Sequence, residues 1–119
     1  MYFNIAKILA RLKMQIADGS YLKEMSKIEK QDLVILDDFG LQPIDSQSRM
    51  IFLEMMEDRY DIRSTIVTSQ LPVSAWHEVI NEKTIADAIL DRLVHSSHRI
   101  DLKGESMRKK RKYIKMEMN

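Results

Sequence analysis

Cysteine is absent from the 119-residue sequence, and glycine and proline are scarce, with three and two residues. Without cysteine the chain has no disulfide framework, no thiolate metal site and no cysteine nucleophile. It also lacks any run of about eighteen apolar residues that would predict a transmembrane helix. Met1 leads into a mixed pattern rather than a basic region followed by an apolar block, so no signal peptide is predicted. We therefore expect a cytoplasmic protein, with no membrane partner, that folds as one globular domain.

The formal charge of +1 conceals an uneven distribution of charge along the chain. Residues 103–119 carry seven basic and two acidic side chains, a local charge of +5, which leaves −4 on residues 1–102. We divide the chain accordingly into a body, 1–102, and a basic C-terminal tail, 103–119. A basic segment on an acidic body suits an acidic partner such as nucleic acid, but a solvated chain end has the same composition.

Apolar periodicity alternates between helical and extended patterns along the body. Helical spacing begins after possible N-cap residues, and runs of apolar or β-branched residues lie between the helical segments. Strands that alternate with helices predict right-handed crossovers and a parallel α/β sheet. The predicted helices follow Asn4, Ser20, Asp45 or Ser46, Ser74 and Thr84, and the predicted strands are 33–36, 64–69 and 98–102.

Two acidic residues follow the first apolar run, Leu33–Leu36, directly. Four consecutive apolar residues predict a strand that is buried on both faces of a parallel sheet. Ligands bind beyond the carboxyl ends of such strands, and adjacent carboxylates there need a cation or hydrogen-bond donors. This is the general Walker B pattern, in which Asp37 holds Mg²⁺ and Asp38 orients or deprotonates the attacking water. The alternative is that Asp38 only caps a turn before Gly40.

The second β-branched run ends in Thr68, Ser69 and Gln70. Their polar groups are suited to hydrogen bonding with a phosphate or a water molecule, although polar residues end most strands. Other side chains have structural interpretations. We predict that Trp76 is a packing anchor. Arg59 either pairs with Asp58 or Asp61 or belongs to a sequence element of the family that the segments quoted below resemble.

Three segments together carry a resemblance to a known family: LVILDDFGLQPID, DRYDIRSTIVTSQLPVSAW and ILDRLVHSSHRIDLKGESMR. In this order they resemble the IstB-like ATP-binding proteins, the helper ATPases of insertion-sequence transposition. Bacterial helicase loaders of the DnaC type are related, and both groups belong to the AAA+ ATPases. The resemblance implies an α/β fold, part of an AAA+ P-loop-type parallel sheet flanked by helices. It also implies ATP and Mg²⁺ as cofactors, and DNA, a transposase and further copies of the chain as partners.

The resemblance assigns roles to individual residues. Asp37 and Asp38 match the Walker B acids, and Arg92 matches an arginine finger that reaches a neighbouring subunit's nucleotide. Without that resemblance, Arg92 would be interpreted as a surface ion pair with Asp87 or Asp91. The remaining assignments are sensor 1 at Ser69 and Gln70 and sensor 2 at Arg108. Independently of the resemblance, the basic run Lys109, Lys110, Arg111 and Lys112 suits contacts with the DNA backbone, and the alternative for Arg108 is that it only helps this run to bind DNA.

The phosphate-binding motif G-x-x-x-x-G-K-[ST] does not occur in the sequence. Glycines of that motif let backbone N–H groups surround the phosphates, and its lysine neutralises their charge. In the family this Walker A strand and helix precede the segment at Met1, so we expect an N-terminally truncated chain. Such a chain should bind ATP weakly, be inactive alone and expose normally covered apolar faces. A helicase-loader relative and a non-enzymatic DNA-binding remnant are the alternatives.

Overall fold

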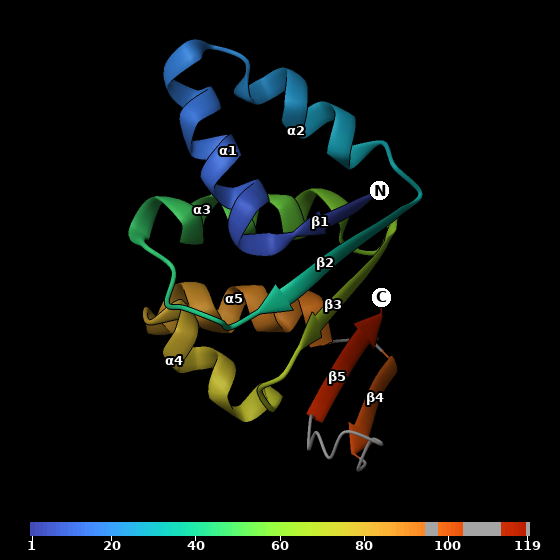
Figure 1. Cartoon of the computed structure of the whole chain (residues 1–119). Coiled ribbons are helices and arrows are strands. Elements are labelled where there is room, and N and C mark those ends of the chain that lie inside the picture. Colours follow the sequence, from blue (N-terminus) through green and yellow to red (C-terminus); the bar gives the residue numbers. More distant parts are fainter. Residues whose placement is uncertain (95–97, 104–112, 119) are drawn as a thin grey trace.

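The computed structural model describes the backbone of residues 1–94, 98–103 and 113–118, and the side chains of residues 1–94. Helices and strands alternate through most of this length, as predicted (Figure 1). The elements are β1 Tyr2–Asn4, α1 Ile5–Asp18, α2 Tyr21–Glu29, β2 Leu33–Phe39, α3 Ser46–Arg59, β3 Ser64–Ser69, the 3₁₀ turn η1 Val73–Ala75, α4 Trp76–Ile80, α5 Lys83–Val94, β4 His98–Lys103 and β5 Tyr113–Met118.

The five strands form one sheet in the order β1-β2-β3-β5-β4. β1, β2 and β3 are parallel, with α1 and α2 between the first two and α3 between the second and third. This confirms the predicted α/β fold with a parallel sheet. The expectation that the strand at His98 is also parallel was wrong, since β4 pairs antiparallel with β5, which pairs antiparallel with β3. Residues 104–112 between them are too few for a crossover of roughly a dozen residues.

Two helices begin at N-cap residues that the sequence predicts. The Asn4 side chain accepts a hydrogen bond from the Lys7 N–H at the start of α1, and Asp45 accepts one from Ser48 at the start of α3. Ser20 occupies the N-cap position of α2 without a side-chain cap. At α5 the carboxylate of Glu82, rather than Thr84, accepts the Ile85 N–H at 2.6 Å.

Side chains on one face of the parallel strands form the core with the helices. Val34, Leu36 and Val67 are fully buried, and they belong to one cluster with the buried residues of α1 to α5. The residues of β2 that alternate with these core residues are not buried. Leu33 is 41% exposed, and Ile35 is partly exposed. The prediction of a strand buried on both faces was therefore wrong, because the helices of the described chain gather on one side of β1 to β3 (Figure 1).

Candidate functional site

The predicted Walker B acids lie at a shift in the register between β2 and β3. Leu36 pairs with Val67 and Phe39 pairs with Ser69, so Asp37 and Asp38 together lie opposite Thr68. Asp38 adopts φ 66°, a left-handed conformation that costs a non-glycine residue on the order of 1 kcal/mol. Such irregularities re-aim side chains and occur often beside active sites. The strand thus presents both carboxylates at its carboxyl end.

Hydroxyl groups from both neighbouring strands hold Asp37. The Tyr2 hydroxyl of β1 donates to one carboxylate oxygen, and the Thr68 hydroxyl of β3 donates to the other. Thr68 in turn accepts the Asp38 N–H at 3.2 Å. The Asp37 side chain is therefore held by a row of hydrogen bonds that runs across β1, β2 and β3.

These hydrogen bonds also determine the charge of the site. The Thr68 and Tyr2 hydroxyls lower the pKa of Asp37, so its carboxylate is ionised at neutral pH. The bond to Asp37 in turn raises the pKa of Tyr2, which keeps the phenol protonated as a donor. A carboxylate has about four lone-pair sites. The hydroxyl bonds leave part of this capacity free, and this donor set fits Mg²⁺, which takes one or two carboxylates together with water and phosphate oxygens.

Ser69 and Gln70, the predicted sensor residues, occupy different environments. Ser69 is buried, and its hydroxyl donates to the Phe39 carbonyl at 2.6 Å and accepts the Leu71 N–H at 3.0 Å. Gln70 is exposed. The residue of β3 whose side chain contacts Asp37 is Thr68. The sequence alone did not show that Thr68 lies directly opposite the two acidic residues. A sensor role for Ser69 or Gln70 stays a prediction.

The loop after β2 is shaped by a glycine and by an aromatic cluster. Gly40 has φ 99°, a conformation that strains any residue with a side chain, and a Cβ there would lie 2.7 Å from Leu71 Cδ1 and would displace that side chain. Phe39, which is 1% exposed, packs against the Trp76 ring at a centroid distance of 4.7 Å. Trp76 is fully buried and donates from Nε1 to the Leu71 carbonyl, which confirms its packing role.

A pocket of about 160 Å³ opens beside Asp38, between α1 and this loop. Its lining is largely apolar and includes Ile5, Leu9 and Pro43. Typical ligand pockets have roughly 300–1,000 Å³. This pocket is therefore too small to enclose a nucleotide by itself.

Arg92 lies far from the two carboxylates, near the other end of the sheet. It is in the last turn of α5, where its guanidinium pairs with Glu57 at 3.5 Å and Asp91 at 3.3 Å and lies over the Tyr60 ring. Tyr60 precedes β3, whereas Asp37 is near the carboxyl end of β2. A strand of six or seven residues spans roughly 20 Å. Arg92 and Asp37 of one chain are consequently not brought together.

Arg59 has a structural role that the sequence did not reveal. Its side chain is 2% exposed, and its partners are the Thr65 hydroxyl and four backbone carbonyls, rather than Asp58 or Asp61. Those carbonyls belong to Ile28, Glu29, Gln31 and Ser64, at distances between 2.6 and 3.3 Å. One guanidinium thus joins the end of α2, the approach to β2 and the start of β3.

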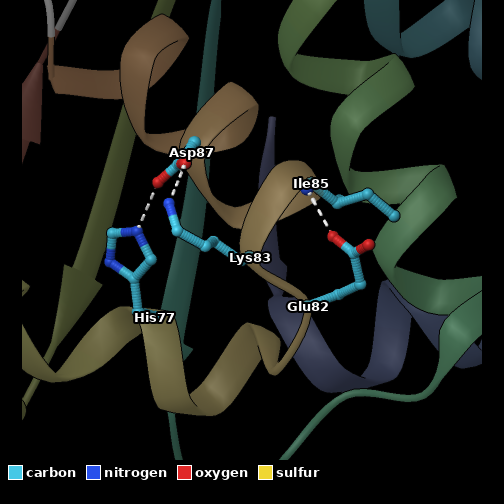
Figure 2. Close-up of polar contacts among 5 residues, drawn as sticks. All are labelled: His77, Glu82, Lys83, Ile85 and Asp87. Atoms are coloured by element: carbon cyan, nitrogen blue, oxygen red, sulfur yellow. Dashed lines mark hydrogen bonds and ion pairs between the residues drawn. The ribbon is translucent and has the colours of Figure 1, made fainter.

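A second polar cluster joins α4 to α5 (Figure 2). His77 Nε2 lies 2.8 Å from one oxygen of Asp87, and Lys83 Nζ lies 3.1 Å from the other. The hydrogen bond with His77, followed by that with Lys83, lowers the pKa of Asp87. These side chains are about half exposed or more and contact no residue of the Asp37 site. The contact between His77 and Asp87 links α4 to α5 at the surface, whereas the pair of Lys83 and Asp87 lies within α5.

Several predictions concern residues that the structure does not describe. Arg108, Lys109, Lys110, Arg111 and Lys112 lie outside the described residues. Within the described ranges, no three His, Cys, Asp or Glu side chains are grouped so that they could hold a metal ion. In the same ranges, no helix has the length and apolar character needed to cross a bilayer.

Comparisons with known proteins match nearly the whole length of the chain. The model of the family "IstB-like ATP binding protein" matches residues 1–114. Over 109 residues the chain is 53% identical to the insertion sequence ATP-binding protein y4pL of Sinorhizobium fredii, covering 92% of this chain and 44% of that relative. It is 48% identical to y4uH of the same organism over 93% and 45% of the two chains. The ATP-binding protein of insertion sequence IS232 from Bacillus thuringiensis is 35% identical over 94% and 44%. The chain therefore spans less than half the length of each of these relatives.

Proposed function

Because the chain belongs to the family of IstB-like ATP-binding proteins, we propose that it provides the metal-binding side of an ATP site that serves transposition of an insertion sequence. The observation that carries the proposal is the pair of carboxylates at the register shift of β2, with Asp37 held by Tyr2 and Thr68. The relatives named above are proteins of insertion sequences, which favours transposition over helicase loading.

In this proposal the two carboxylates have separate tasks. Asp37 would hold Mg²⁺, which, when bound, offsets negative charge on the phosphate oxygens of ATP. Tyr2 and Thr68 keep Asp37 ionised and in one orientation. Asp38 lines the pocket beside the site, where its carboxylate would orient or deprotonate the water that attacks the γ-phosphate.

Arg92 would act on a different copy of the chain. Its position near the amino end of β3 excludes contact with the carboxylates of its own subunit. A guanidinium keeps its charge and donates a planar set of hydrogen bonds, so it suits phosphate oxygens across an interface. We therefore propose ATP hydrolysis only in an oligomer, with a transposase as a further partner.

The metal site can be tested in the chain as it stands. Mn²⁺·ATP should first broaden the amide NMR signals of Asp37, Asp38 and Thr68, because paramagnetic broadening falls steeply with distance from the ion. We expect weak binding, since the sequence has no phosphate-binding loop, and Asp37→Asn should lower the affinity about tenfold, or roughly 1.4 kcal/mol. Asp87→Asn is the matched control, because that carboxylate is exposed on α5. Broadening that is centred elsewhere, or that is unchanged in Asp37→Asn, would contradict the metal site.

We also propose that the basic run at Lys109, Lys110, Arg111 and Lys112, with Arg108 beside it, binds the DNA backbone. Lysine and arginine release counterions when they neutralise phosphates, so affinity falls with salt. Replacing Lys109 and Lys110 by glutamine should reduce the slope of log K against log salt by about 2, roughly 1 for each lysine. Fluorescence anisotropy with a short duplex at several salt concentrations measures this slope. Lys23→Gln with Lys27→Gln is the control, and an equal change there would refute a specific role of the tail.

A further inference from the structure

The pocket between α1 and the loop after β2 combines apolar walls with a carboxylate. Ile5 and Leu9 of α1 and Pro43 of the loop belong to the apolar walls. Asp38 also lines the pocket, and among the described residues its side chain has no hydrogen-bond or ion-pair partner. Apolar walls with a few polar groups are the usual form of a binding site. The carboxylate therefore favours a ligand that carries a positive charge.

The charges around the pocket are negative in sum. Among the described residues that line it, those with charged side chains are Lys13, Asp38 and Asp45. Lys13 and Asp45 pair with each other, so their charges cancel and that of Asp38 is left. The neighbouring Asp37 adds to the negative potential, because the two hydroxyls that hold it are neutral donors. A cation would offset this charge, whereas an anion would be repelled.

The size of the pocket limits the apolar part of its ligand to about one side chain. The pocket has about 160 Å³, and an engineered apolar cavity of about 150 Å³ binds benzene. A four-carbon chain is of similar size, and lysine carries its ammonium on such a stem. Ala6 and Ala10 of α1 also line the pocket, and side chains this small let a polypeptide backbone lie close to the helix.

We propose that this pocket binds a lysine side chain of a partner polypeptide, with the stem between α1 and the loop and the ammonium on Asp38. A bound lysine would occupy the carboxylate that the proposed hydrolysis assigns to the attacking water. The two uses of Asp38 exclude each other, so a docked partner would hold the site inactive. The inference goes beyond the proposed ATP site and does not rest on it, because the pocket and its charge are present without nucleotide.

Titration of the whole chain with capped amino acids, without nucleotide or divalent ions, tests the pocket. Nα-acetyl-lysine methylamide should shift the amide NMR signals of Leu9 and Gly40, with a dissociation constant on the order of millimolar for so few contacting atoms. The norleucine analogue has the same four-carbon stem without the ammonium. It should bind about fivefold more weakly, the upper range for an ion pair that solvent reaches. n-Butylamine, which lacks the peptide backbone, should also bind more weakly than capped lysine.

Two pairs of variants separate the charge from the shape of the pocket. Asp38→Asn should remove the preference for lysine over norleucine, since asparagine accepts the left-handed backbone at this position. Asp61→Asn is the matched control, because Asp61 has φ 61° and is exposed before β3. Ala10→Leu should block the pocket for both probes. Ala17→Leu is its control, because Ala17 is exposed on α1 outside the pocket lining, and Trp76 fluorescence verifies that each variant is folded.

The inference is overturned if capped lysine and capped norleucine bind equally well, if Asp38→Asn keeps the preference for lysine, or if Ala10→Leu leaves binding unchanged. An equal loss of preference in Asp61→Asn would overturn it too, because the effect would then not belong to the pocket. n-Butylamine that binds as tightly as capped lysine would also overturn it, since the pocket would then accept a free amine rather than a polypeptide.

Discussion

Replacing Arg59 by methionine should lower the free energy of unfolding by about 3–5 kcal/mol. Methionine keeps much of the apolar stem of the side chain but removes every hydrogen-bond donor. The carbonyls of Ile28, Gln31 and Ser64, with the Thr65 hydroxyl, would lose a charged partner in a region from which water is largely excluded. Single domains are stable by only about 5–15 kcal/mol. A large fraction of Arg59→Met should therefore be unfolded under mild conditions.

Urea denaturation measures this loss, with Trp76 as the reporter. Trp76 is the one tryptophan of the sequence and is fully buried, so its fluorescence follows the core. Arg59→Lys should recover part of the stability, because an ammonium group keeps the charge but cannot reproduce the planar set of donors. Arg11→Met is the matched control. Arg11 is half exposed, pairs with Glu24 at the surface and should cost about 1 kcal/mol or less. An Arg59→Met variant as stable as Arg11→Met would refute the assigned role.

Phe39→Ala should lower the free energy of unfolding by a similar amount, about 3–5 kcal/mol. The Phe39 ring is buried between Phe52 of α3 and Trp76 of α4, at centroid distances of 5.7 and 4.7 Å. Removing it leaves a cavity between two helices and the end of β2. Because Phe39 follows Asp38 directly, the same cavity should loosen the backbone that presents the two carboxylates.

Two measurements separate the effects of Phe39→Ala. Urea titration gives the loss of stability, and the emission of the folded variant should shift to longer wavelength as water approaches Trp76. Phe3→Ala is the control, since Phe3 is only partly buried at the edge of the core and should cost less. If Phe39→Ala and Phe3→Ala have the same stability and the same emission maximum, the aromatic cluster does not support the site.

Local signals in the sequence predicted much of the architecture. Apolar runs and capping residues located β2, β3, α1 and α3, and two adjacent acids after an apolar run located the candidate site. These features depend on neighbours along the chain. The direction of β4 does not, because among the described strands β4 pairs only with β5, which itself lies antiparallel against the edge of β3.

For the charged residues too, the sequence revealed neighbours along the chain but not partners from distant segments. Asp37 and Asp38 are adjacent in sequence, so the pair is evident from the letters alone. Tyr2 and Thr68 are distant in sequence from Asp37, and only the register of three strands brings their hydroxyls to its carboxylate. Arg59 resembled a surface residue among acids until the fold placed four carbonyls around it.

The sequence by itself determined the order of helices and strands from α1 to β4, the family resemblance and the two carboxylates at the end of β2, because periodicity and adjacent residues encode them, but these patterns did not predict β1 or β5. The tertiary structure decided what surrounds those residues. It placed two hydroxyls on Asp37, enclosed Arg59 and separated Arg92 from the carboxylates of its own chain. Burial and long-range pairing arise only when distant segments meet, and no pattern within a single segment contains them.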